Sequence, residues 1–459
     1  MPAISPCEYE LITIESDQGV TIDLRLGVVS FQYFEDLFSP TITAKMVIIS
    51  TSGVVSDDKT KKIESLYNGL PIRGGERVSI RIKGNTNINK GLQFDTPDKY
   101  LYVSKISNVI RDGQKEIFVL HLVSREAITN EVTHVKRKFQ PYSLIDTHVK
   151  DILKNDLKVK LNRYVGNIER ASNRYGFLGN LKSPFQILVW LASKATPNTQ
   201  TSGGYTGYFF YQTQSGFNFR SVDSLIRDGL DGRTARTNFK ATREYTHKQF
   251  TDYIKETGDF NILAYSVSRN NDLLRKLIIG QFSNFTASFN PLNGKFSKVE
   301  EGTFNLLDIL NQPKGKKFST LGNIPEVPTL LSDDGMGLGE LPSRIMSVVK
   351  DVGTLSKEAS KYQDPSSKPS QTQMEALVRY NLLFQQVVKI VIPLNTNLQA
   401  GEVVKLNFLG APEGSTYDRQ QSGYYLIKEL CHAFDTEQSI TSMTVIRDTF
   451  GEFGQNTGN

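Results

Sequence analysis

Alternation of apolar and polar residues dominates the first quarter of the chain and predicts β-strands there. Residues 8–50 alternate through three or four such segments, and residues 74–84 and 98–125 continue the pattern. Asp112-Gly113 separates two matched segments, which is typical of a β-hairpin turn. We therefore expect an antiparallel β-barrel domain over residues 1–125.

The same pattern recurs near the C-terminus. Gly75-Glu76 aligns with Gly401-Glu402, and each pair is followed by apolar residues at a period of two. After a gap of similar length, each copy continues with a pair of long alternating segments. The pair lies within residues 100–125 in the first copy and within residues 424–447 in the second. The pattern therefore predicts an internal repeat, with a second barrel over residues 375–451. Three such chains would present six similar units.

Between these copies the apolar spacing changes to three and four, which predicts helices over residues 125–139, 143–156, 183–194 and 373–386. Ser183 has the position of an N-cap, with Pro184 after it and Gln186 at capping-box spacing. Residues 205–221 predict a hairpin that turns at Ser215-Gly216. Residues 126–310 are therefore expected to form a mixed α/β middle region.

The later part of this interval is less regular. Residues 248–256 are helix-like, whereas residues 273–290 contain aromatic, strand-like runs. Residues 311–374 are rich in Pro, Gly, Ser and charge, which indicates an insertion or arm with one helical patch at 343–362. Residues 452–459 are expected to be a frayed tail. The predicted fold class is mainly β with an α+β middle region and a long insertion.

Composition agrees with several β-rich domains. A chain of 459 residues is long for one core, and its 26 Phe and 19 Tyr favour sheets. The net charge of +6 is small and spread along the chain, so it indicates a mixed solvated surface. Cys7 and Cys431 are expected to be reduced, in keeping with assembly in a cytoplasm. The N-terminus lacks the pattern of a signal peptide, and no apolar run is long enough for membrane insertion.

No catalytic signature is present. HExxH, GxSxG and the phosphate-binding P-loop pattern do not occur, and the five histidines are scattered singly rather than at metal-ligand spacing. Adjacent carboxylates such as Glu35-Asp36 point to opposite faces of a strand, so they do not form an acid/base couple. We therefore predict no catalytic, cofactor-binding or metal-binding residues and no enzymatic activity.

Two further features allow alternatives. Short basic clusters at 136–138 and 314–317 suggest nucleic-acid binding, although neither extends into a longer basic stripe. The aromatic hairpin 205–221 either buries its side chains within a two-sided sheet or uses them to anchor a contact between subunits.

Several stretches carry a family resemblance. The run LPIRGGERVSIRIKGN (70–85) and residues 100–132, 207–226 and 392–451 resemble the central baseplate hub proteins of contractile-tailed bacteriophages, of the T-even-like and cyanophage type. The last stretch is also similar to a module of type VI secretion spikes. The resemblance spans most of residues 8–310 and 375–451 and omits the insertion.

This resemblance implies a homotrimer in which each subunit gives two tube-type barrels to a pseudo-six-fold ring. The ring would join the hexameric tail tube to a trimeric central spike, often a spike-lysozyme, beside the baseplate wedge proteins. DNA would only pass through its channel during ejection. The implied location is the virion tail baseplate, after assembly in the host cytoplasm, and no cofactor is implied.

From the repeat and the aromatic hairpin we predict protein–protein interface residues in two groups. The GE-containing strands and the long hairpin supply Arg73, Glu76, Arg77, Glu402, Lys405 and Lys428, and the aromatic hairpin supplies Tyr208, Phe210, Phe217 and Phe219. Three alternatives remain open: the hub of a bacterial contractile injection system, a carbohydrate-active β-protein, and a nucleic-acid-binding protein.

Overall fold

The structure is a computed structural model of the whole chain. It describes residues 4–17, 19–51, 55–56, 63–64, 72–86, 89–112, 115–161, 165–198, 205–230, 243–247, 260–269, 272–290, 294–296, 303–306, 319–322, 337–349, 369–410, 417–418 and 420–449. The predicted helix 248–256 and the predicted tail 452–459 lie outside these residues.

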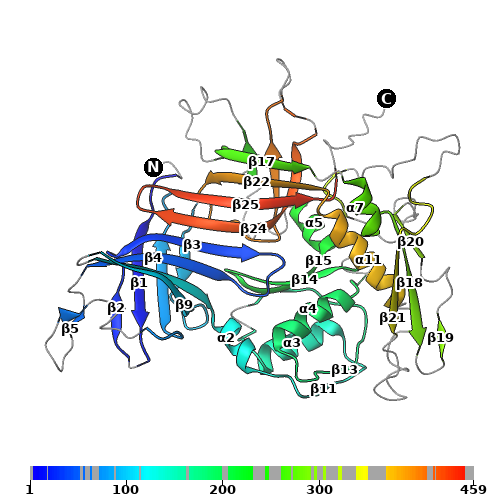
Figure 1. The fold of residues 1–459 in the computed structure, drawn as a ribbon, viewed down its shortest axis with the longest axis horizontal. Coiled ribbons are helices and arrows are strands. Elements are labelled where there is room, and N and C mark those ends of the chain that lie inside the picture. Colours follow the sequence, from blue (N-terminus) through cyan, green and yellow to red (C-terminus); the bar gives the residue numbers. More distant parts are fainter. Residues whose placement is uncertain are drawn as a thin grey trace.

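The N-terminal strands form a first module around one apolar core (Figure 1). Six of its strands follow one another in the order β3-β4-β10-β9-β7-β1, all antiparallel, and β2 and β8 pair at its margin. Two further short strands, β5 (Val55–Ser56) and β6 (Ile63–Glu64), pair with each other. The strands of the module are β1 (Glu8–Glu15), β2 (Thr21–Asp23), β3 (Val28–Asp36), β4 (Thr43–Thr51), β7 (Arg77–Lys83), β8 (Leu92–Phe94), β9 (Leu101–Asp112) and β10 (Lys115–Ser124).

A second module repeats this strand order as β17-β22-β25-β24-β23-β16 around its own core. The six strands also occur in the same order along the chain as their counterparts, with one difference: β16 runs parallel to β23, whereas β1 is antiparallel to β7. Its strands are β16 (Glu244–Thr246), β17 (Ala264–Arg269), β22 (Gln386–Pro393), β23 (Val403–Asn407), β24 (Gly423–Asp435) and β25 (Ser439–Arg447). The predicted start at residue 375 therefore misses β16 and β17, which come from far upstream.

The two modules share one continuous sheet. Strand β3 of the first module pairs with β24 of the second, from Asp36 opposite Glu429 to Ser30 opposite Asp435. The sheet has 14 strands in the part of the chain that the structure describes, and the long hairpin β24–β25 lies along β3 and β4 (Figure 1). Neither local pattern nor turn chemistry specifies this contact, because the two partners lie almost 400 residues apart.

The middle unit follows the first module and carries most of the helices. Helix α2 ends at Val132 rather than at the predicted 139, because the chain then turns extended and Val135 bridges to Lys182. Helix α4 begins after Ser183 as predicted, but the Ser183 side chain makes no capping bond. Instead, Asn130 Oδ1 accepts from the Phe185 N–H at 2.7 Å. The unit comprises α2 (Arg125–Val132), β11 (Lys138–Phe139), α3 (Ile145–Asn155), β12 (Val165–Ile168), β13 (Phe177–Leu178), α4 (Pro184–Lys194), β14 (Tyr208–Thr213), β15 (Gly216–Ser221) and α5 (Val222–Leu230).

A small sheet is inserted between β17 and β22. In it β18 pairs with β19, β20 and β21, and helix α11 packs on one face. Two predictions are wrong here: residues 273–278 are helical rather than strand-like, and residues 344–349 form a strand rather than a helix. The elements are α7 (Leu273–Ile278), β18 (Ser283–Asn290), β19 (Lys295–Phe296), β20 (Thr303–Asn305), β21 (Arg344–Val349) and α11 (Pro369–Leu382).

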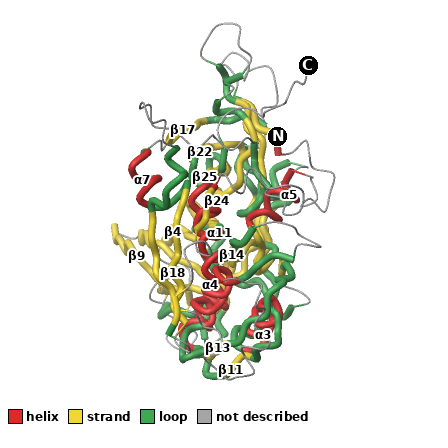
Figure 2. The backbone as a smooth tube through the Cα atoms, turned by 90° about the vertical axis from the view of Figure 1, so that its right-hand side faces the viewer, coloured by secondary structure: helices red, strands yellow, loops and turns green. Residues whose placement is uncertain are grey.

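Helices α4 and α11 contact each other and thereby connect the middle unit with the inserted sheet, with strands on both sides in the view of Figure 2. The predicted fold class, mainly β with α+β parts, is confirmed.

Candidate functional site

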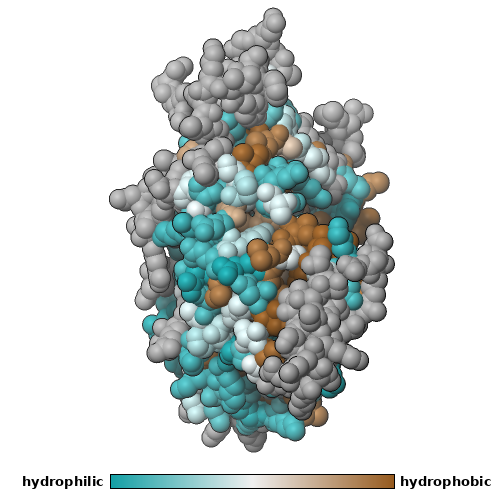
Figure 3. Space-filling view, turned by 90° about the vertical axis from the view of Figure 1, so that its left-hand side faces the viewer, coloured by the Kyte–Doolittle hydropathy of each residue, from teal (hydrophilic) through white to brown (hydrophobic). Residues whose placement is uncertain are grey.

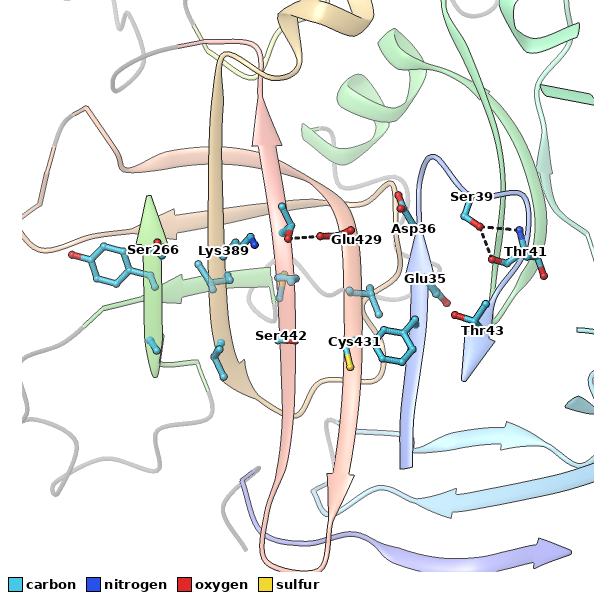
Figure 4. Close-up of a pocket in the computed structure, with 18 residues that line it drawn as sticks. Glu35, Asp36, Ser39, Thr41, Thr43, Ser266, Lys389, Glu429, Cys431 and Ser442 are labelled. Carbon is cyan, nitrogen blue, oxygen red and sulfur yellow. Dashed lines mark hydrogen bonds between the residues drawn. The ribbon is translucent and has the colours of Figure 1, made fainter. Parts of the chain in front are cut away.

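One face of the shared sheet forms a continuous wall across both modules. A first row of directly opposite residues crosses six strands: Ala264, Val391, Ser442, Cys431, Phe34 and Thr43. The next row on the same face is Ser266, Lys389, Thr444, Glu429 and Asp36. We call these two rows the junction wall. They line a cleft of about 770 Å³, and Figure 4 shows their side chains along neighbouring strands.

The charged row of the junction wall is internally balanced. Glu429 and Asp36 lie opposite each other, an arrangement of like charges that disfavours pairing. Lys428 offsets it, with its Nζ 3.0 Å from Glu429 Oε2 and 3.6 Å from Asp36 Oδ2. Partial burial opposes ionisation of Glu429, but a 2.7 Å hydrogen bond from Thr444 and the charge of Lys428 hold its pKa below the usual value. The wall therefore combines apolar side chains in its first row with hydroxyl groups and charges of both signs.

Beneath the wall, one carboxylate ties three parts of the chain together. Glu35 is buried in β3 and accepts hydrogen bonds from the Tyr33 hydroxyl at 2.8 Å, the Gln214 N–H at 2.7 Å and the Ala400 N–H at 2.8 Å. Gln214 belongs to the β14–β15 turn, and Ala400 precedes β23. Burial raises the pKa of Glu35 to about 7 despite these donors. The sequence shows Glu35 only as one of two adjacent carboxylates, and it does not indicate that Glu35 is buried or connects these segments.

The first Gly-Glu turn has a defined geometry. Gly75 adopts φ +93°, and its N–H donates to the Val103 carbonyl at 2.7 Å, while the Val103 N–H donates back to the Glu76 carbonyl at 3.0 Å. The Glu76 carboxylate accepts from the Arg73 N–H three residues upstream at 2.6 Å. The turn is thereby fixed against the long strand β9.

The second Gly-Glu turn repeats each of these contacts. Gly401 adopts φ +83°, its N–H donates to the Ile427 carbonyl at 2.9 Å, and the Ile427 N–H donates back to the Glu402 carbonyl at 2.8 Å. The Glu402 carboxylate accepts from the Gln399 N–H, again three residues upstream, at 3.2 Å. The repeat seen in the sequence therefore corresponds to the same backbone arrangement in both copies.

The predicted interface residues on these strands do not gather at one place. Arg73 is exposed, and Arg77 pairs with Glu15 and stacks on Tyr100 at 4.6 Å. Two others lie in the second module: the partly buried Glu402 carboxylate is 2.6 Å from Arg243, and Lys405 Nζ is 2.8 Å from Glu244. Lys428 pairs with Glu429 and Asp36 of the junction wall. The role of these residues in contacts between subunits stays a prediction.

The four predicted aromatic residues require a correction. Tyr208, Phe210, Phe217 and Phe219 are at most 4% exposed and belong to the apolar core of the middle unit. Phe210 and Phe217 stack with their ring centroids 5.6 Å apart. These side chains are therefore buried within one chain and do not form a surface for a partner, so the other reading of the alternating pattern, a two-sided sheet, is correct.

The sheet that carries the junction wall has open edges at β17 and along the outer half of β9. Among the described residues, β17 pairs only with β22, and β9 beyond Val103 pairs only with β10. Apolar side chains lie exposed at both edges: Tyr265 at the first, and Val109 and Ile110 at the second. The side of the molecule that includes the first module has a polar surface interrupted by a hydrophobic band (Figure 3). The path from β17 to β9 thus comprises eight strands, and both of its end strands have an edge that is unpaired among the described residues.

Chemistry of other kinds is not indicated in the described residues. They contain no group of three His, Cys, Asp or Glu side chains arranged to hold a metal ion. Both cysteines are free thiols and half-buried. Within the same residues, no helix combines the length and apolar character needed to cross a bilayer.

Two solved structures share the fold over nearly the whole chain. A tail protein from Neisseria meningitidis MC58 aligns with 95% of this chain and 96% of its own, at a TM-score of 0.51 and 9% identity. The 43 kDa tail protein of prophage MuSo2 from Shewanella oneidensis aligns with 96% and 98%, at a TM-score of 0.50 and 10% identity. No protein-family model and no curated protein matches the sequence. The expected likeness to phage tail proteins is therefore confirmed at the level of the fold.

Proposed function

We propose that this protein is the structural hub of a contractile phage tail baseplate. Three copies form a ring that joins the hexameric tail tube to a trimeric central spike. The ring encloses part of the channel through which DNA leaves, and the wedge proteins of the baseplate surround it. The protein has a structural rather than a catalytic role, because it matches the symmetry of its partners. It resides in the virion.

The observation that carries this proposal is the repeated module. Two units with the same strand order and the same Gly-Glu turn lie side by side in one sheet. Three such chains around an axis present six near-equivalent units, which matches a six-fold partner while the ring itself keeps three-fold symmetry. For this role the two modules need a similar backbone geometry rather than a similar sequence. The two Gly-Glu turns have such a similar backbone geometry.

The open sheet edges support a ring of identical subunits. If β17 of one copy pairs with the free half of β9 in the next, the contact is head-to-tail, and a rotation that closes produces a ring. Such pairing covers edges that would otherwise invite aggregation. The junction wall then faces a common space, and its balanced charges and hydroxyl groups suit passage of a polyanion without tight binding. The two tail proteins with the same fold are consistent with this assignment.

The decisive measurement is the mass of the purified protein by sedimentation equilibrium. We expect three times the chain mass of 51.5 kDa over a wide concentration range. Averaged electron micrographs along the symmetry axis should then show six similar lobes around a central hole. A monomer at all concentrations, or a ring with only three lobes, would refute the proposal.

A further inference from the structure

Strand β18 of the inserted sheet buries polar side chains. On the face that packs against α11, β18 contributes the polar residues Asn284, Thr286 and Ser288, all of them buried. Its alternate residues Phe285 and Phe289 point to the opposite face and are only half-buried. A two-layer sheet normally buries its apolar face and exposes its polar one. In β18 this order is reversed, whereas Phe304 of β20 and Met346 of β21 add apolar side chains to the buried face.

The open face spans three strands, with Ala287 and Ser347 between its larger apolar side chains. Ile345 lies opposite Phe285, and Val349 lies opposite Phe289, in the parallel pair β21–β18. On the other side of β18, Phe296 lies opposite Phe289, with the ring centroids 5.0 Å apart. We call these five side chains the open apolar face.

Exposure of this face is large. Ile345 is 71% exposed, Phe296 68% and Val349 58%. Together these three side chains expose on the order of 400 Å², which is in the range of the largest apolar patches on soluble proteins, and such patches are often functional. The outer edge of β21 adds backbone groups, since within the described residues β21 pairs only with β18.

Helix α7 connects this sheet with the open edge β17. It follows β17 in the chain, and its Leu274 and Ile278, one turn apart, are each 72% exposed. At its end, the Ile279 carbonyl accepts from Arg344 at the start of β21. Exposed apolar side chains therefore also occur on α7, which lies with the inserted sheet at the end of the molecule remote from the first module (Figure 1).

We infer that the open apolar face is covered by a neighbouring copy of the same chain, an inference that rests on the proposed ring. Obligate subunit interfaces bury roughly 1,000 Å² or more on each partner. The short edge strand β17, with six residues, supplies only part of this area. The open apolar face can supply part of the remainder, and covering it removes its exposed apolar side chains from water.

The test is a charge placed on the face in the full-length protein. The double variant Ile345→Lys/Val349→Lys should raise the dissociation constant of the trimer at least tenfold in sedimentation equilibrium. The milder variant Ile345→Thr/Val349→Thr keeps β-branched side chains and should cause a smaller shift in the same direction. Leu26→Lys is the matched control, because Leu26 is fully exposed in a turn of the first module and should leave the mass unchanged. Circular dichroism establishes that each variant is folded.

The outcomes separate the two proposals. If both double variants are folded and remain trimeric like the wild type, the face is covered by something other than a second copy, and this inference fails while the ring stands. Equal dissociation of the Leu26→Lys protein would also overturn it, because the effect would then be unspecific. A monomeric wild type would refute the proposed function itself.

Discussion

A single buried arginine joins three distant segments, and its removal should be among the most damaging substitutions in the chain. Arg379 of α11 is 1% exposed, and its guanidinium lies 2.7 Å from Asp223 of α5 and 2.9 Å from Asp448 after β25. It also donates to the Ser319 carbonyl. The two carboxylates are themselves 0% exposed, so Arg379 is the cation that compensates both.

We expect Arg379→Met to reduce the free energy of unfolding by about 3–5 kcal/mol, because it leaves uncompensated charge in the interior. Methionine retains much of the packing volume, so the loss reports the charge rather than a cavity. The two aspartates keep backbone donors, from Tyr205, Ser319 and Leu321, which prevents a still larger loss.

The assay is urea unfolding followed by circular dichroism, with Arg25→Met as control. Arg25 pairs with Asp23 at 2.7 Å, but both side chains are almost half exposed, so solvent screens the pair and its loss should change the stability little. The triple variant Arg379→Met/Asp223→Asn/Asp448→Asn should regain part of the loss. If Arg379→Met costs no more than Arg25→Met, or if neutralising the aspartates recovers nothing, the charge argument is wrong.

Two further predictions concern the junction of the modules. Burial raises the pKa of Glu35 to about 7 from an ordinary 4.5, so the folded state retains a proton that the unfolded chain releases, and stability should fall by about 3 kcal/mol as the pH rises from 4.5 to above 7. Glu35→Gln should flatten this dependence in unfolding experiments between pH 5 and 8; an unchanged slope would exclude Glu35 as its source. Alanine at the two turn glycines should act unequally: Gly75→Ala meets no atom within 4 Å and should cost about 1 kcal/mol for its positive φ, whereas a methyl group at Gly401 would lie 2.6 Å from the Tyr211 hydroxyl oxygen and should cost clearly more. Equal shifts in urea midpoint would contradict the packing difference.

Local pattern determined much of the architecture. Alternation at a period of two identified β1 to β4, β7, β9 and β10, and the aligned Gly-Glu pairs revealed the repeat, because a left-handed turn followed by a half-buried strand leaves a clear signature. Helices α3, α4 and α11 were likewise found from their 3–4 spacing, within a few residues at the ends.

The secondary structure of several short segments depends on their tertiary contacts. Residues 344–349 contain apolar residues that suit either a helix or a strand, and pairing with β18 selects the strand. Residues 273–278 become a helix whose N-cap is Asp272, which accepts from the Arg275 N–H. The short strands β16 and β17 leave no clear periodic pattern in the sequence. Their pairing with β23 and β22 in the sheet of the second module defines them.

The sequence by itself therefore determined the kinds of element, the duplication and the mainly β class, since these depend on side-chain periodicity within a few residues. Only the tertiary structure decided that the hairpin aromatics are core, that β3 joins β24, and that Glu35 and Arg379 tie distant segments together. Those contacts link segments that lie far apart in the sequence, and they form only when the surfaces that carry them are packed together, which no local pattern specifies.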